Sequence, residues 1–98
     1  MVKIHGNWCG PGWTAGQSKD AKDMVPSDYL VNCTDKLDCA CKVHDIDVFE
    51  RGGRTRGSDS RLSNVALRMS YDLRLPRALR RKALLVATGM LIGRSQNR

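Results

Sequence analysis

Residues 39–45 read Cys-Ala-Cys-Lys-Val-His-Asp, and residues 8–12 read Trp-Cys-Gly-Pro-Gly. The first stretch places His44 beside Asp45, three residues after Cys41. The second stretch carries Cys9 inside a glycine loop, so that a bond from this cysteine could hold the loop against the His-Asp pair. Together the two stretches supply a base, an acidic ligand and a loop of backbone oxygens, a combination that no other part of the chain offers.

The neighbouring positions of His44 and Asp45 suit two different tasks on one helix. Residues three apart share a helix face, so His44 lies on the same face as Cys41, whereas Asp45 is rotated by about 100°. Asp45 can therefore reach a cation in the glycine loop, while His44 faces a cleft beside it. Calcium binds oxygen ligands and often combines a carboxylate with backbone carbonyls. The pattern is typical of a calcium-dependent hydrolase.

Three segments of the chain resemble the phospholipase A2 superfamily. The calcium loop of that family reads roughly Cys-Gly-x-Gly, as at residues 9–12, and its active helix reads Asp-x-Leu-Asp-x-x-Cys-x-x-His-Asp, as at residues 35–45. An Asp-x-x-Leu run at residues 59–62 is similar to the later helix that supplies a second aspartate. The overall size is closer to the short viral and invertebrate domains than to venom or pancreatic enzymes, which place a longer segment with a small β-wing between the two helices.

The resemblance implies hydrolysis of the sn-2 ester of glycerophospholipids. His44 would activate a water as general base, Asp59 would hold its far nitrogen, and the Gly10 N–H would face the oxyanion. Calcium (Ca²⁺) would be held by the carboxylate of Asp45 and by the backbone carbonyls of Trp8, Gly10 and Gly12. We therefore expect an enzyme, with an inactive calcium- or membrane-binding relative as the alternative.

Two features depart from the family pattern. The family usually has a tyrosine four residues after the histidine, where it bonds the second aspartate, but this chain has Val48. A polar brace is therefore missing at that position, which favours the inactive alternative. In addition, an ideal antiparallel hairpin with a rise of ~1.5 Å per residue would place Asn64 or Val65, rather than Asp59, opposite His44.

Four cysteines in 98 residues indicate one small domain, residues 1–98, that disulfides stabilise in an oxidising compartment. Four cysteines allow three pairings, and the resemblance implies Cys9–Cys41 and Cys33–Cys39. A tetrahedral zinc site that includes His44 is the alternative, although the Cys-x-Cys-x-x-His spacing differs from that of common zinc fingers and ribbons. Residues 1–6 contain no apolar run typical of a signal peptide. We therefore expect a mature or excised piece of a longer secreted or viral protein.

The net charge of +7 is unevenly distributed. Residues 1–50 carry five Lys and Arg against eight Asp and Glu, whereas residues 51–98 carry twelve against two. Acidic groups thus gather where a cation would bind, and basic groups where an anionic surface would dock. A basic nucleic-acid-binding domain is the alternative, but the aromatic residues are not interleaved with the arginines and no motif of that class is present. We therefore expect a phospholipid membrane as the partner, and no nucleic acid.

The candidates for membrane docking are Trp13 and the basic start of the last predicted helix. Trp13 suits a cleft mouth or a lipid surface, and a core position suits it equally. The apolar run at residues 83–92 is too short to span a bilayer, which takes about 20 helical residues. The alternative to anchoring at anionic headgroups is a C-terminal helix that packs on the rest of the protein and carries basic residues at its start. The basic candidates are Arg77, Arg80, Arg81 and Lys82.

The apolar periodicity predicts an all-α fold: a calcium loop, an antiparallel helix hairpin and a C-terminal helix. Residues 5–29 lack a sustained period and are predicted to form the calcium loop and a connector. The active helix is predicted over residues 35–50, with Thr34 or Asp35 as its N-cap and Gly52 at its end.

Two further helices are predicted after a flexible basic turn at residues 51–57. The first covers residues 58–72, with Ser58 as its N-cap and Asp59 in its first turn. The second covers residues 76–92, because Pro76 suits a helix start and Gly93 suits a helix end.

Overall fold

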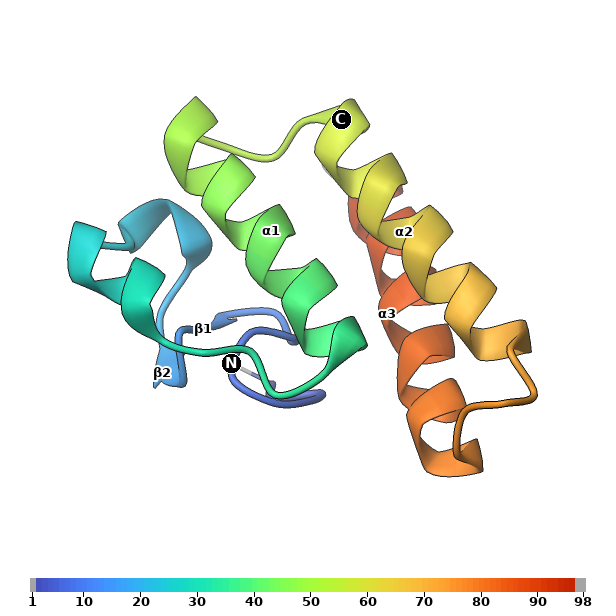
Figure 1. Ribbon diagram of the computed structural model, residues 1–98. Coiled ribbons are helices and arrows are strands. Elements are labelled where there is room, and N and C mark those ends of the chain that lie inside the picture. Colours follow the sequence, from blue (N-terminus) through green and yellow to red (C-terminus); the bar gives the residue numbers. More distant parts are fainter. Residues whose placement is uncertain (1, 97–98) are drawn as a thin grey trace.

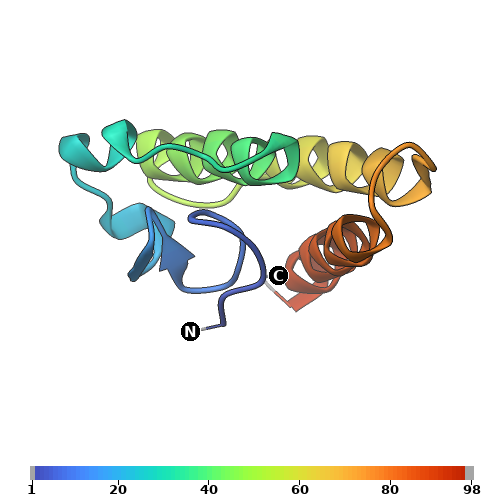
Figure 2. The ribbon, with the colours of Figure 1, turned by 60° about the horizontal axis from the view of Figure 1, so that its bottom comes forward.

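Three helices make up most of the structure, a computed structural model that describes the backbone of residues 2–96 and the side chains of residues 2–90. They are α1 (Lys36–Arg51), α2 (Arg56–Tyr71) and α3 (Arg77–Gln96). Helices α1 and α2 run antiparallel (Figure 1). In Figure 2 these two helices form one layer, and the start of the N-terminal segment and α3 lie beneath it. The mostly helical fold is confirmed.

The N-terminal segment is more ordered than the predicted loop. It contains an antiparallel hairpin of β1 (Trp13–Thr14) and β2 (Gln17–Ser18), followed by two 3-10 helices, η1 (Ala21–Asp23) and η2 (Pro26–Leu30). Ala15 and Gly16 form the turn between the strands, with φ angles of 54° and 71°. Two consecutive positive φ angles suit a tight hairpin, because they match the twist of the strands. The all-α prediction was therefore too narrow for this segment.

Helix α1 is capped at both ends by neighbouring residues of the chain. The Asp35 side chain accepts a hydrogen bond from the Asp38 N–H at 2.9 Å, which makes Asp35 the N-cap. Gly52 ends the helix with φ of 75°, in the left-handed region that glycine adopts most readily. The buried residues lie on one helix face, so this face packs into the core; they are Leu37, Asp38, Cys41, His44 and Val48.

Helix α2 begins two residues before the predicted start. Thr55 is the N-cap, since its hydroxyl accepts from the Ser58 N–H at 3.0 Å. The Ser58 hydroxyl in turn accepts from the Thr55 N–H at 3.2 Å. Ser58 therefore completes a reciprocal capping pair from the third helical position, and the prediction that it caps the helix itself was wrong.

Helix α3 follows Pro76 as predicted but continues past Gly93 to Gln96. A glycine inside a helix costs about 1 kcal/mol relative to alanine, which neighbouring helix-forming residues can offset. Ala83, Val86 and Ala87 are buried against the rest of the molecule. The alternative of a packed C-terminal helix is thus confirmed for this part of the chain. No helix within the described residues is long and apolar enough to cross a membrane.

Two disulfides join the N-terminal half of the molecule. Cys9 is bonded to Cys41 with a Cα–Cα distance of 5.2 Å, and Cys33 is bonded to Cys39 with a Cα–Cα distance of 4.9 Å. These are the two pairings that the resemblance implied. No cysteine is free for a zinc site, so the zinc alternative was wrong. Disulfides are consistent with an oxidising compartment.

Candidate active site

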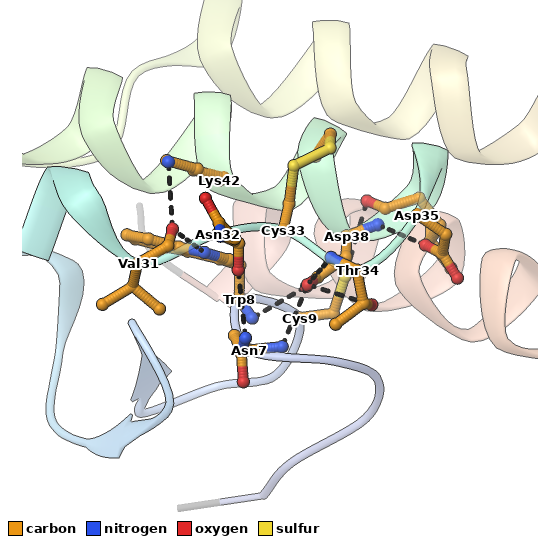
Figure 3. Close-up of a disulfide and its surroundings, with 12 residues drawn as sticks. Asn7, Trp8, Cys9, Val31, Asn32, Cys33, Thr34, Asp35, Asp38 and Lys42 are labelled. Atoms are coloured by element: carbon orange, nitrogen blue, oxygen red, sulfur yellow. Dashed lines mark hydrogen bonds between the residues drawn. A yellow bond between two sulfur atoms is a disulfide. The ribbon is translucent and has the colours of Figure 1, made fainter.

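A buried carboxylate fastens the N-terminal loop to α1. Asp38 is fully buried, and its oxygens accept the backbone N–H groups of Asn7 at 3.0 Å and Trp8 at 2.8 Å. The Thr34 N–H donates to the same carboxylate at 2.9 Å. Figure 3 shows these bonds converging on Asp38 close to the disulfides. A Cβ at position 6 would collide with the Asp38 carboxylate, so the loop can lie this close to α1 only with glycine at that position.

The glycine loop that follows has backbone conformations that favour glycine. Gly10 has φ of 141° and Gly12 has φ of 67°. A Cβ on Gly10 would strike the backbone carbonyl of Val2, so no larger residue fits there. The Gly10 carbonyl accepts from the Trp13 N–H at 3.1 Å and retains a second lone pair. The disulfide from Cys9 fixes this loop against Cys41, one helical turn before Asp45.

The imidazole of His44 is paired with the carboxylate of Asp59. The distance from His44 Nε2 to Asp59 Oδ1 is 2.8 Å, and both residues are buried. A carboxylate at Nε2 favours the tautomer with the proton on that nitrogen, which leaves Nδ1 as the basic atom. Burial opposes a charge on His44, but its hydrogen bonds with Asp45 and Asp59 outweigh burial and raise its pKa. In this arrangement Asp59 can orient the ring, and Nδ1 can accept a proton.

An ideal hairpin was expected to place Asn64 or Val65 opposite His44, and this expectation was wrong. Asn64 is exposed, and Asp59 occupies the position opposite the histidine. The ideal register assumes that α2 starts level with the end of α1. Instead α2 is displaced along α1, so that its first turn lies beside His44 (Figure 1). The connection over residues 52–55 allows this displacement, because it runs across between the helices rather than reversing tightly.

Asp45 carries a buried oxygen without a partner. Its side chain is 13% exposed, and its Oδ1 lies 3.5 Å from His44 Nδ1. The Oδ2 atom is buried, and no hydrogen-bond donor among the described side chains and backbone reaches it. Burial raises the pKa of Asp45 to about 6, although the neighbouring His44 and Thr14 favour the charged form. A bare carboxylate oxygen at this depth is unfavourable unless a cation or a proton binds it.

Arg54 contacts both carboxylate oxygens of Asp59, including the oxygen that His44 contacts. Its Nη2 donates to Asp59 Oδ2 at 2.8 Å, and its Nε lies 3.1 and 3.2 Å from the two carboxylate oxygens. Burial favours the neutral form of Asp59, but the hydrogen bonds from Arg54 and His44 outweigh burial and lower its pKa. Sequence reasoning missed Arg54, because an arginine in a basic turn between glycines gives no signal of its contacts.

A pocket of about 520 Å³ is lined by His44, Asp45 and Arg54, among other residues. Its polar wall includes His44 and Asp45, and its apolar wall comes largely from α3 and from Leu62 of α2. The N-terminal wall contains the glycine loop at residues 10–12, and Val48 contributes an apolar surface where the family has tyrosine. The pocket can accept a molecule that is apolar at one end and polar at the other.

The predicted docking residues are not all exposed. Arg77 and Arg81 are exposed on α3, whereas Arg80 and Lys82 are half-buried. Lys82 Nζ lies 3.4 Å from His5 Nδ1, and His5 Nε2 lies 2.6 Å from Asp35 Oδ2. His5 therefore links α3 to the start of α1.

The two tryptophans are held by hydrogen bonds to the backbone. Trp8 is buried, and its Nε1 donates to the Val31 carbonyl at 3.3 Å. Trp13 is half-buried, and its Nε1 donates to the Gly6 carbonyl at 2.9 Å. Neither side chain is a freely projecting anchor.

Comparisons of the chain with family models, with curated proteins and with solved structures returned no match. The described residues contain no group of three or more His, Cys, Asp or Glu side chains that could hold a metal. A site made of one carboxylate and backbone carbonyls does not need such a group.

Proposed function

We propose that this protein is a calcium-dependent phospholipase of the A2 type, which hydrolyses the sn-2 ester of glycerophospholipids at a membrane surface. The observation that carries the proposal is the buried His44–Asp59 pair, whose basic nitrogen lies beside Asp45, a carboxylate with one buried oxygen that has no partner among the described residues. A base next to a candidate cation site, on the wall of a partly apolar pocket, suits the hydrolysis of an ester in an amphipathic substrate.

His44 is the general base in this proposal. Asp59 accepts the Nε2 proton, so Nδ1 can take a proton from a water as that water attacks the ester carbonyl. Asp59 then stabilises the imidazolium that forms, without accepting its proton. The ring later returns the proton to the leaving alcohol. The Gly10 N–H is the proposed donor to the oxyanion.

The residues of the loop fit a calcium ion. Asp45 Oδ2 is buried and unpartnered, which is the state expected of a ligand atom considered without its cation. Positive φ angles at Gly10 and Gly12 give the loop the freedom to direct carbonyls towards that carboxylate. The proposed ligands are Asp45 and the backbone carbonyls of Trp8, Gly10 and Gly12. When bound, calcium supplies positive charge that polarises the ester carbonyl.

A stripe on α3 supports docking of the pocket mouth on a membrane. Arg77, Arg81 and Leu85 follow one another at intervals of four residues, so they share one helix face. All three are exposed, and Leu85 also lines the pocket. Arginines beside an apolar side chain suit an interface with anionic headgroups. We therefore propose that this stripe directs the pocket towards the lipid.

Release of fatty acid from phospholipid vesicles tests the function. The purified chain is assayed with calcium and with a chelator, next to the variants His44→Gln and Asp45→Asn. We expect release with calcium only, and a loss of at least ~10³-fold in each variant. Release that persists in the chelator would contradict the calcium role. No release by the folded, calcium-loaded wild type would favour the inactive relative.

A further inference from the structure

We infer that Arg54 is the positioning residue of the site: its guanidinium fixes the Asp59 carboxylate and, through it, the His44 ring. The inference rests on the proposed function, because it explains how the proposed base is oriented. Val48, at the position of the family's tyrosine, is buried and has no side-chain donor. The side chain that holds Asp59 is instead Arg54, from the loop between α1 and α2.

The contacts of Arg54 define the plane of the carboxylate. Nε and Nη2 together reach both oxygens of Asp59, at distances between 2.8 and 3.2 Å. A planar guanidinium that contacts both oxygens restricts the rotation of the carboxylate, which a single donor cannot do. Since Asp59 Oδ1 also bonds His44 Nε2 at 2.8 Å, the fixed carboxylate fixes the ring.

The environment strengthens this arrangement. The Asp59 side chain is 4% exposed and that of Arg54 is 30% exposed, so the pair is shielded more than a surface ion pair. The guanidinium also balances the negative charge that Asp59 brings into the interior. Without it, the buried carboxylate would have His44 as its main side-chain partner, and a single donor would leave the carboxylate free to rotate.

The variants Arg54→Gln and Arg54→Lys test this role, with Arg51→Gln as the matched control. Arg51 lies three residues earlier, and its Nε donates to Asp47, a carboxylate outside the His44–Asp59 pair. Turnover is measured on a short-chain phospholipid below its micelle concentration with saturating calcium. We expect Arg54→Gln to lower kcat on the order of tenfold with KM within about twofold of wild type. The kcat of Arg54→Lys should lie between those of wild type and Arg54→Gln, because lysine keeps the positive charge but cannot contact both carboxylate oxygens with a planar group. Arg51→Gln should match wild type.

A second readout does not depend on turnover. Nitrogen NMR of labelled histidine reports which nitrogen of His44 carries the proton in the folded protein. We expect the Nε2–H tautomer in wild type and Arg51→Gln, and a mixture of tautomers in Arg54→Gln. If Arg54→Gln does not fold, Arg54→Lys is judged by the same criteria.

The outcomes separate the two claims. Unchanged kcat and an unchanged tautomer in the Arg54 variants would overturn the positioning role, even if the wild type is an active phospholipase. A wild type without activity would contradict the proposed function, and the tautomer measurement would then decide the role of Arg54 alone.

Discussion

Asp38 and Asp45 are both carboxylates on α1 in the interior, but their surroundings differ. Asp38 accepts hydrogen bonds from three backbone N–H groups, whereas Asp45 Oδ2 has no donor among the described residues. A satisfied buried charge supports the fold, and an unsatisfied one weakens it. The contrast identifies Asp38 as the structural carboxylate and Asp45 as the candidate ligand.

Substitution of each aspartate by asparagine should therefore change stability in opposite directions. In the presence of a chelator, Asp45→Asn should raise the free energy of unfolding by about 1–2 kcal/mol, because it removes a buried charge of which one oxygen lacks a donor. Asp38→Asn should lower it by about 2–3 kcal/mol, because its amide group would face a backbone donor. Urea unfolding of the two variants measures both effects. A loss of stability in Asp45→Asn as large as that in Asp38→Asn would contradict the distinction.

At the scale of the elements, the two disulfides close loops of very different length. Cys9 and Cys41 are 32 residues apart, whereas Cys33 and Cys39 are 6 apart. The chain-entropy relation assigns about 4 kcal/mol to the longer loop and about 2 kcal/mol to the shorter. We expect Cys9→Ala with Cys41→Ala to lower stability more than Cys33→Ala with Cys39→Ala. Only the first pair should also weaken calcium binding, as measured by calorimetry, because only this bond holds the glycine loop on α1.

The η2 segment is held by a buried carboxylate whose effect depends on pH. Asp28 is buried and accepts hydrogen bonds from the Lys19 ammonium, the Val25 N–H at 2.9 Å and the Gln17 amide at 3.1 Å. The hydrogen bond from Lys19 is the main cause that lowers the pKa of Asp28. A lowered pKa stabilises the fold above the unfolded-state pKa of about 3.9, and this contribution is lost as the pH falls through the folded-state value.

Asp28→Asn should consequently be less stable than wild type at pH 7 by about 1–3 kcal/mol. The difference should shrink once the pH falls below about 4, because the wild-type carboxyl then gains a proton. Urea unfolding from pH 7 to pH 2.5 gives the difference directly. A difference that stays constant over this range would show that the charge of Asp28 does not contribute.

The helix caps and the cysteines in the sequence predicted much of the fold. The caps Asp35 and Gly52 placed α1 within one residue at each end, because capping depends on neighbours in the chain. Thr55 and Ser58 are two hydroxyl residues three apart, and the sequence did not show which of them starts the helix. The displacement of α2 along α1 depends on tertiary contacts such as the His44–Asp59 pair, which have no local signature. The apolar periodicity therefore could not predict the His44–Asp59 contact with certainty, and it gave no indication of the role of Arg54.

At the scale of the whole molecule, charge is segregated along the chain. Residues 51–98 hold twelve of the seventeen basic residues, and two of them lie in the exposed stripe on α3, whose third member, Leu85, lines the pocket. We expect the double variant Arg77→Gln with Arg81→Gln to bind anionic vesicles about 30-fold more weakly, since each such charge contributes about 1 kcal/mol. The control is Arg56→Gln with Arg68→Gln, which removes equal charge from exposed positions on α2.

Hydrolysis of a monomeric short-chain lipid should be unchanged in the α3 double variant, because the two arginines are not among the proposed catalytic groups. Co-sedimentation with vesicles at two salt concentrations measures the binding. An equal loss in both double variants would indicate a diffuse charge effect and would contradict docking through α3.

The central claim is that His44, oriented by Asp59, directs a water to the sn-2 ester beside a calcium ion. The most direct test uses a phospholipid with two different acyl chains and analyses the products by mass spectrometry. The proposal predicts free sn-2 fatty acid and the matching 1-acyl lysophospholipid, formed with calcium by the wild type and not by His44→Gln. Release of the sn-1 chain, or equal product from His44→Gln, would contradict it.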